Sequence, residues 1–220
     1  MSSKYERELR QVLAGLSKGV DAIIKSCNEL EKAKMKLIEK RPFLVVRAAG
    51  SGIEGSGDLL ALRGDLCFPI EVKSSKEAKL YLSGRTVEQY NSLVYEGNRS
   101  CLMPLYAYRL KGVRGDSWRI FRVETETLHG KLRKLEPSIP CLPLTRNGKP
   151  YLNWEEGMPL NEFIALVCSQ VNDNETKMKN LQTRSNITTS HMKFEGHNKN
   201  TEIKTKRKRN ILAELKRRKL

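Results

Sequence analysis

Histidine, paired cysteine and long apolar segments are scarce or missing in this 220-residue chain. Its three histidines, His129, His191 and His197, lie in no metal-binding or catalytic-triad spacing. The five cysteines are widely separated and form no C-x-x-C pair, which argues against a zinc site or a disulfide framework and favours a reducing intracellular compartment. No apolar run approaches the ~20 residues that cross a bilayer, and the first residues lack the apolar core of a secretory signal. We therefore expect no membrane association.

Positive charge is what the chain has in excess, with 41 Lys and Arg residues against 25 Asp and Glu residues, and a net charge of +16. Such a balance predicts a polyanionic partner. Residues 171–220 carry +9 of this charge and only one aromatic residue, Phe194. We expect them to form a basic, mostly disordered tail, because they cannot bury enough apolar surface to offset the ordering entropy. The tail, with its basic block 204–209, would contact DNA or a protein partner, or would only improve solubility.

The hydrophobic pattern of residues 1–170 predicts one mixed α/β domain in the order α–β–β–β–α–β with additions. We expect helices over 4–16, 20–38, 85–96, 124–134 and 159–170, and strands over 43–48, 58–63, 67–73, 101–109 and 117–123. A loop at 50–57 holds four glycines, and 137–153 is typical of irregular structure. The Gly64-Asp65 pair predicts a hairpin between the second and third strands.

Asp58, Glu71 and Lys73 are the residues with the clearest chemical pattern. Side chains alternate along a strand, so Glu71 and Lys73 share a face, and a hairpin at Gly64-Asp65 would place Asp58 almost opposite Glu71. Two converging carboxylates repel unless a cation lies between them, and Mg²⁺ prefers such ligands together with water and phosphate oxygens. The pattern indicates a metal-assisted phosphodiester hydrolase, while a cross-strand salt bridge is the alternative for the same residues.

Several separated motifs occur in an order that resembles a known family. They are Tyr5–Leu9, Val45–Gly52 before Asp58, Ile70–Ser75, Tyr81 and Gln89. Together they resemble the archaeal Holliday junction resolvases of the PD-(D/E)xK nuclease superfamily, over roughly residues 4–110. The resemblance implies a restriction-endonuclease-like core, a central mixed β-sheet flanked by helices, and the resolution of four-way DNA junctions by paired cuts.

The resemblance also implies roles for individual residues. Glu6, Asp58 and Glu71 would hold Mg²⁺, with Mn²⁺ able to replace it, while Lys73 and Ser51 would complete the catalytic set. Arg7, Arg47, Ser51 and Gln89 would contact DNA, and Gln89 could instead help to hold the site. Symmetric cutting implies a homodimer, and the family points to the cytoplasm of an archaeal or archaeal-virus host cell.

Two departures from the family pattern stand out. Residues 17–41 make the N-terminal part longer than usual and suggest a helical insertion, and Gly57 replaces the proline of the Pro-Asp motif. Motifs near a metal do not fix the DNA substrate, so a nuclease of the same superfamily acting on flaps, nicks or duplex DNA is an alternative. A basic DNA-binding protein without catalytic activity is a further alternative.

Overall fold

The computed structural model describes residues 4–48 and 57–169. The predicted tail, and the predicted loop with Ser51 up to residue 56, lie outside the described residues. By its internal contacts the chain divides into a unit of residues 1–175 and a unit of residues 176–220. All described residues belong to the first unit.

A six-stranded mixed sheet, with strand order β1-β2-β3-β5-β6-β8, forms the centre of the domain. Its strands are β1 (Leu44–Arg47), β2 (Leu59–Arg63), β3 (Leu66–Ser75), β5 (Leu105–Leu110), β6 (Trp118–Arg122) and β8 (Met158–Pro159). β3 and β5 run parallel, and the other neighbouring strands are antiparallel. A parallel pair requires a crossover connection, which contains helix α4 (Arg85–Ser100). The mixed α/β class and the predicted order of the main elements are confirmed.

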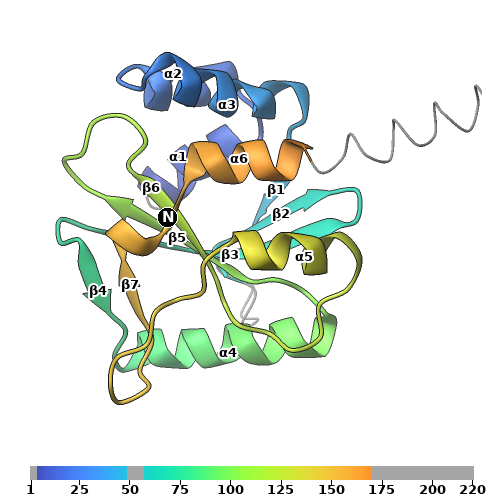
Figure 1. Ribbon diagram of the computed structural model, residues 1–220, viewed down its shortest axis with the longest axis vertical. Helices are drawn as coiled ribbons and strands as arrows, with labels where there is room; N and C mark the ends of the chain where they lie inside the picture. The colour runs from blue at the N-terminus through green and yellow to red at the C-terminus, as the bar shows by residue number, and fades with distance from the viewer. Residues whose placement is uncertain (1–3, 49–56, 170–220) are drawn as a thin grey trace, which may run out of the picture. The chain divides into compact units, whose positions relative to one another are not determined.

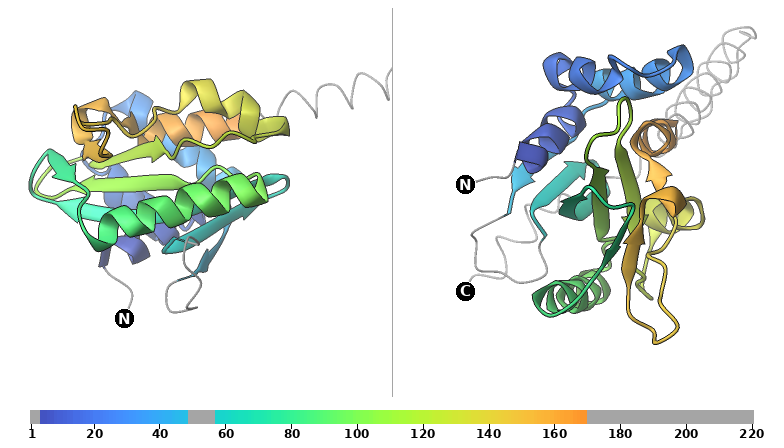
Figure 2. Two further views of the ribbon diagram at one scale, coloured as in Figure 1. Left: turned by 90° about the horizontal axis from the view of Figure 1, so that it is seen from below. Right: turned by 90° about the vertical axis from the view of Figure 1, so that its left-hand side faces the viewer.

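Helices cover both faces of this sheet (Figures 1 and 2). One face carries α1 (Lys4–Leu13), α2 (Ser17–Ile24), α3 (Glu29–Lys40), α5 (Gly130–Leu135) and α6 (Leu160–Ser169). The other face carries α4 and a small two-stranded sheet of β4 (Lys79–Tyr81) and β7 (Tyr151–Asn153). A hydrophobic core lies on each face of the sheet, and β5 contributes to both because its side chains alternate. Leu105 and Ala107 pack on the first face, while Tyr106 and Tyr108 pack on the second.

The helix predicted over 20–38 is two helices, α2 and α3. A capping box at the start of α3 separates the two helices: Asn28 Oδ1 accepts a hydrogen bond from Glu31 N at 2.9 Å, and Glu31 Oε2 accepts one from Asn28 N at 2.9 Å. Such a box satisfies backbone donors that a continuous helix would otherwise bond, so a new helix starts here. The predicted helical segment 17–41 is thus a pair of helices, and Met35 and Ile38 of α3 lie in the core.

Two other predicted segments differ from the structure. Only the end of the helix predicted over 124–134 forms, because Glu126 N and Thr127 Oγ1 donate hydrogen bonds to Asn98 at the end of α4 instead. The segment 137–153, predicted to be irregular, contains a short 3-10 helix (Glu136–Ser138) at its start and β7 at its end, and a second 3-10 helix (Trp154–Glu156) follows. A three-residue strand leaves little periodicity in the sequence, and the strand that pairs with β7 lies about seventy residues earlier.

In the part of the chain that the structure describes, no helix has the length and apolar character needed to span a membrane. All five cysteines are free thiols, and two of them, Cys27 and Cys168, are buried.

A buried carboxylate joins the beginning of β6 to the beginning of α6. Asp116 accepts hydrogen bonds from Trp118 N at 3.2 Å and from both Asn161 N and Asn161 Nδ2 at 2.8 Å. It is 9% exposed and Asn161 is 3% exposed, so water cannot replace these partners at little cost.

Asp116→Ala should therefore lower the free energy of unfolding by roughly 2–4 kcal/mol, because hydrogen bonds to a charged group are lost and buried donors are left without a partner. Chemical denaturation followed by circular dichroism measures the change. The matched control is Glu162→Ala, next to Asn161 on α6, which removes an exposed ion pair with Lys34 of α3 and should cost about 1 kcal/mol or less. Equal losses in the two variants would contradict this account.

Candidate active site

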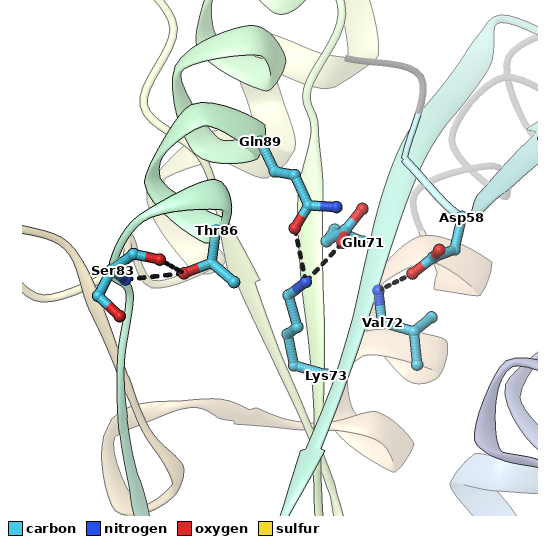
Figure 3. A network of polar contacts seen from close by, with 7 residues as sticks. All are labelled: Asp58, Glu71, Val72, Lys73, Ser83, Thr86 and Gln89. Carbon is cyan, nitrogen blue, oxygen red and sulfur yellow. Dashed lines mark hydrogen bonds and ion pairs between the residues drawn. The ribbon is translucent and has the colours of Figure 1, made fainter. Parts of the chain in front are cut away.

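Asp58 and Glu71 lie close together where β2 pairs with β3, as the predicted hairpin requires. The turn at Gly64-Asp65 sets a register that pairs Arg63 with Leu66 and Leu59 with Ile70, and Asp58 directly precedes β2 at this end of the pairing. The regular ladder ends here, since Asp58 N donates to Ile70 O at 2.9 Å and residues 58 and 59 both lie across from Ile70. Val72 N donates to Asp58 Oδ2 at 2.8 Å, which fixes the direction of the carboxylate (Figure 3).

The backbone conformation of residue 57 explains why a glycine, and not the proline of the Pro-Asp motif, precedes this aspartate. Its φ angle is +69°, and a Cβ atom there would lie 2.7 Å from Ile70 O. Proline fixes φ near −65° and cannot adopt this conformation, so only glycine permits the close approach of the two strands at this point.

Lys73 joins β3 to α4. Its Nζ donates hydrogen bonds to Glu71 Oε1 at 2.7 Å and to Gln89 Oε1, on the first half of α4, at 2.9 Å (Figure 3). Val72, between them in sequence, packs toward the core on the opposite face. The prediction that Glu71 and Lys73 share one face is confirmed, and Gln89 is close enough to orient the amine.

Burial and mutual repulsion shape the electrostatics of this group. Glu71 is 5% exposed. Burial is the main cause that raises the pKa of Asp58 from 3.8 to about 6, the Glu71 carboxylate raises it further, and Glu6 adds a smaller effect; the Val72 N–H and Lys73 act in the opposite direction. A nearby cation stabilises the ionised form of two neighbouring, partly buried carboxyl groups. Lys73 provides one such positive charge through its ion pair with Glu71.

The two glutamates of the Glu-Arg-Glu segment serve different sites. Glu6 faces β1, where its Oε2 lies 3.7 Å from Nε of Arg47, and its charge acts on Asp58. Glu8 lies on another side of α1, where its Oε1 accepts hydrogen bonds from Arg109 Nε at 2.8 Å and Trp118 Nε1 at 2.9 Å. Residues two apart on a helix point in different directions, so only Glu6 is directed to the candidate site.

The structure places the remaining predicted residues as follows. Arg47 lies at the end of β1, beside Glu6, and remains partly exposed. Arg7 is exposed on α1. Ser51 lies outside the described residues, so its predicted role near the phosphate stays a prediction.

Tyr106 is a site residue that the sequence patterns did not single out. It stands beside Glu71 in the parallel register of β3 and β5, it is fully buried, and its hydroxyl has no hydrogen-bond partner among the described residues. Burial first, and then the charge of Glu71, raise the pKa of this phenol, which keeps it a hydrogen-bond donor. An aromatic residue in a strand is typical of a core, and only the register shows that Tyr106 is next to the acids.

The residues present fit a hard divalent cation. Among the described residues, Asp58 uses only Oδ2 and Glu71 only Oε1 in hydrogen bonds, so each carboxylate retains one oxygen for a ligand. Residues 4–48 and 57–169 contain no group of three or more His, Cys, Asp and Glu side chains close enough to enclose an ion. Two carboxylates suit Mg²⁺, which keeps several waters and phosphate oxygens as its other ligands.

Comparison with known proteins agrees with the motifs. Residues 25–134, half of the chain, match the family model of the archaeal Holliday junction resolvases, Hjc. The matched part contains Asp58, Glu71, Lys73 and Gln89, and it begins within the segment 17–41. A solved structure of Hjc from Archaeoglobus fulgidus, a Holliday junction resolvase from an archaeal hyperthermophile, is 24% identical over 61% of this chain and 97% of that chain, with a TM-score of 0.39. The family match confirms the resemblance to this family, and it covers the motifs from Val45 onward, while the Tyr5–Leu9 motif lies before the matched residues. The chain belongs to the family of archaeal Holliday junction resolvases, and it is thereby a nuclease.

Proposed function

We propose that this protein resolves four-way DNA junctions by metal-dependent hydrolysis of phosphodiester bonds, with Asp58 and Glu71 as the metal ligands and Lys73 as the amine at the attacking water. The observation that carries the proposal is the convergence of two carboxylates and one lysine at the paired ends of β2 and β3. A structural salt bridge alone would not require a second carboxylate with a raised pKa beside the first.

Lys73 is held where its amine can take part in proton transfer and compensate negative charge on the phosphate. Two of its three N–H groups donate to Glu71 and Gln89, which leaves the third for a water or for a nonbridging phosphate oxygen. Water adds to phosphorus and loses a proton, while the leaving oxygen gains one as its bond to phosphorus breaks. A positive charge directed at the phosphate compensates the negative charge that grows in the transition state.

Mg²⁺, or Mn²⁺ in its place, would polarise the phosphoryl oxygen and lower the pKa of a bound water. Glu6 lies beside Arg47 and its charge acts on Asp58, so it would orient the site from its edge. As a third ligand it would have to move closer to Asp58 and Glu71, because the described residues hold no group of three such side chains close enough to enclose an ion. Arg47, Arg7 and Ser51 would contact the phosphate backbone, which positions DNA without reading its sequence.

We further propose that the protein acts as a homodimer in the cytoplasm. Paired symmetric cuts need two active sites, and a two-fold assembly matches the two-fold character of a four-way junction.

Asp58→Asn and Glu71→Gln should each abolish junction cleavage while junction binding survives, because each change removes a ligand charge and leaves the shape of the side chain. Lys73→Met should slow cleavage by roughly 10²–10⁴-fold, the range that a positioned proton-transfer group supplies. Single-turnover cleavage of a labelled junction in Mg²⁺, with gel-shift binding in parallel, measures both effects.

Glu29→Gln, on the exposed side of α3, is the control and should cut as fast as the parent. Undiminished metal-dependent cleavage by purified Asp58→Asn protein would rule out this site.

The raised pKa of Asp58 predicts a stability effect that is separate from activity. A carboxyl whose pKa is about 6 in the folded chain and 3.8 in the unfolded chain stabilises the fold when protonated, and this contribution is lost as the pH rises through about 6. In metal-free buffer at pH 8, Asp58→Asn should therefore melt at a higher temperature than the parent. The gain should shrink below pH 6 and vanish near pH 4, and excess Mg²⁺ should stabilise only the parent. Equal melting temperatures at pH 8 would contradict the electrostatic account.

The junction preference is tested by cleavage of a mobile four-way junction against matched linear duplex, flap and nicked DNA. We expect the junction to be cut at least tenfold faster than any of the others. Faster cutting of a flap or a nicked duplex would identify that DNA as the preferred substrate. Binding of DNA without any cleavage in Mg²⁺ or Mn²⁺ would favour a non-catalytic DNA-binding protein.

A further inference from the structure

The small sheet of β4 and β7 presents a stacked pair of aromatic rings, of which Tyr81 is exposed and Tyr151 is half-buried. The register places Tyr81 opposite Tyr151, and the two rings stack with centroids 5.4 Å apart and an angle of 26° between their planes. Tyr81 is 61% exposed, so one face of its ring is open to solvent. The opposite side of the same small sheet is closed, because Leu152 is buried and Leu80 packs against the core around α4.

Two exposed cations lie on the short hairpin that leads into β7 and its first residue, Tyr151. Residues 143–151 form the hairpin, which is closed by the bridge between Leu144 and Pro150, with Arg146 and Lys149 exposed near its tip. In the described part of the chain, neither residue has an ion-pair partner, and the same holds for Lys79, on the face that bears Tyr81, and for Arg85, which begins α4.

Acidic residues lie at the other end of the small sheet. Glu77 precedes β4, and Glu155 and Glu156 follow β7, next to the Lys79–Asn153 pair. The end with the tyrosine pair and the hairpin tip is therefore the cationic one.

This surface is connected to the candidate active site. β4 leads through residues 82–84 into α4, whose Gln89 accepts a hydrogen bond from Lys73. Both Figure 1 and the right-hand view of Figure 2 show the hairpin extending past the end of β7, on the side of the main sheet where α4 lies. The hairpin and Tyr151 lie beyond residue 134, where the family match ends.

We propose that the stacked pair Tyr81–Tyr151 binds an unstacked base of the DNA next to the branch point, while Arg146 and Lys149 contact the phosphates that flank it. This inference rests on the proposed function in one respect, namely that branched DNA is the substrate. An open aromatic face stacks on the face of a base, and unpaired cations nearby attract the backbone on either side of it.

The same chemistry explains why a branch point is the target. Bases within a continuous duplex are stacked on both sides and offer no free face to Tyr81. The stack is interrupted where four arms meet, so a base there can be covered by a tyrosine ring at little cost. The surface would thus select the branch by stacking, and the phosphate contacts would add affinity that falls with salt.

The test measures binding of the full-length protein to a four-way junction that carries 2-aminopurine at the branch point. EDTA in the buffer makes the readout independent of cleavage, so a failure of the proposed hydrolysis leaves this result interpretable. Tyr81→Leu should bind the junction roughly 5- to 100-fold more weakly, the range that stacking on one base supplies, and should lose the fluorescence change of the probe. Tyr81→Phe, which keeps the ring, should behave as the parent.

Tyr95→Leu is the matched control, because Tyr95 is 65% exposed on the surface of α4 and should not alter binding. Arg146→Gln combined with Lys149→Gln should reduce the slope of log affinity against log salt by about 2, one phosphate contact for each cation. Thermal melting of each variant verifies its folding.

Two results would overturn the proposal. One is junction binding by Tyr81→Leu that equals that of the Tyr95→Leu control, with an unchanged probe signal. The other is a change of oligomeric state in Tyr81→Leu by sedimentation, which would identify the surface as a contact between copies of this chain.

Discussion

The antiparallel pairing of β2 with β3 is the constraint on which the candidate site depends. Its register is fixed by the Gly64-Asp65 turn, and a slip of one residue would move every side chain of one strand to the other face. In this register Asp58 meets Glu71, and the Val72 N–H orients the Asp58 carboxylate. The positive φ of Gly57 belongs to the same constraint, because the chain must pass within contact distance of Ile70 O before it enters β2.

Helix α4 has two structural roles in this protein. It is part of the crossover that makes β3 and β5 parallel, and its Gln89 side chain holds Lys73 beside Glu71. The crossover brings Tyr106 next to Glu71, so a buried hydroxyl without a partner among the described residues borders the acids. The site therefore combines a local hairpin with one long-range connection, and each part fixes different members of the group.

Much of this could be predicted from the residues, and the limits have physical causes. Alternation in β3 predicted a shared face for Glu71 and Lys73, since period 2 is a local property of a strand. The division of residues 17–41 into α2 and α3 depended on the Asn28–Glu31 capping box, a signal that two apolar stretches in similar phase concealed. The pairing of β7 with β4 left little trace in the sequence, because a three-residue strand has no measurable periodicity and its partner is remote.

The sequence by itself determined the family, the mixed α/β class, and the Asp58, Glu71 and Lys73 group, because a hairpin and the alternation of side chains are encoded within about sixteen residues. Only the tertiary structure decided that Gln89 holds Lys73, that Glu6 and not Glu8 is directed to the site, and that Tyr106 borders Glu71. These relations join segments that are far apart in the chain, and they follow from how helices pack on a sheet, which no local pattern of residues specifies. The scarcity of histidine and the absence of paired cysteine agree with the chemistry of this site, which uses carboxylates and one amine.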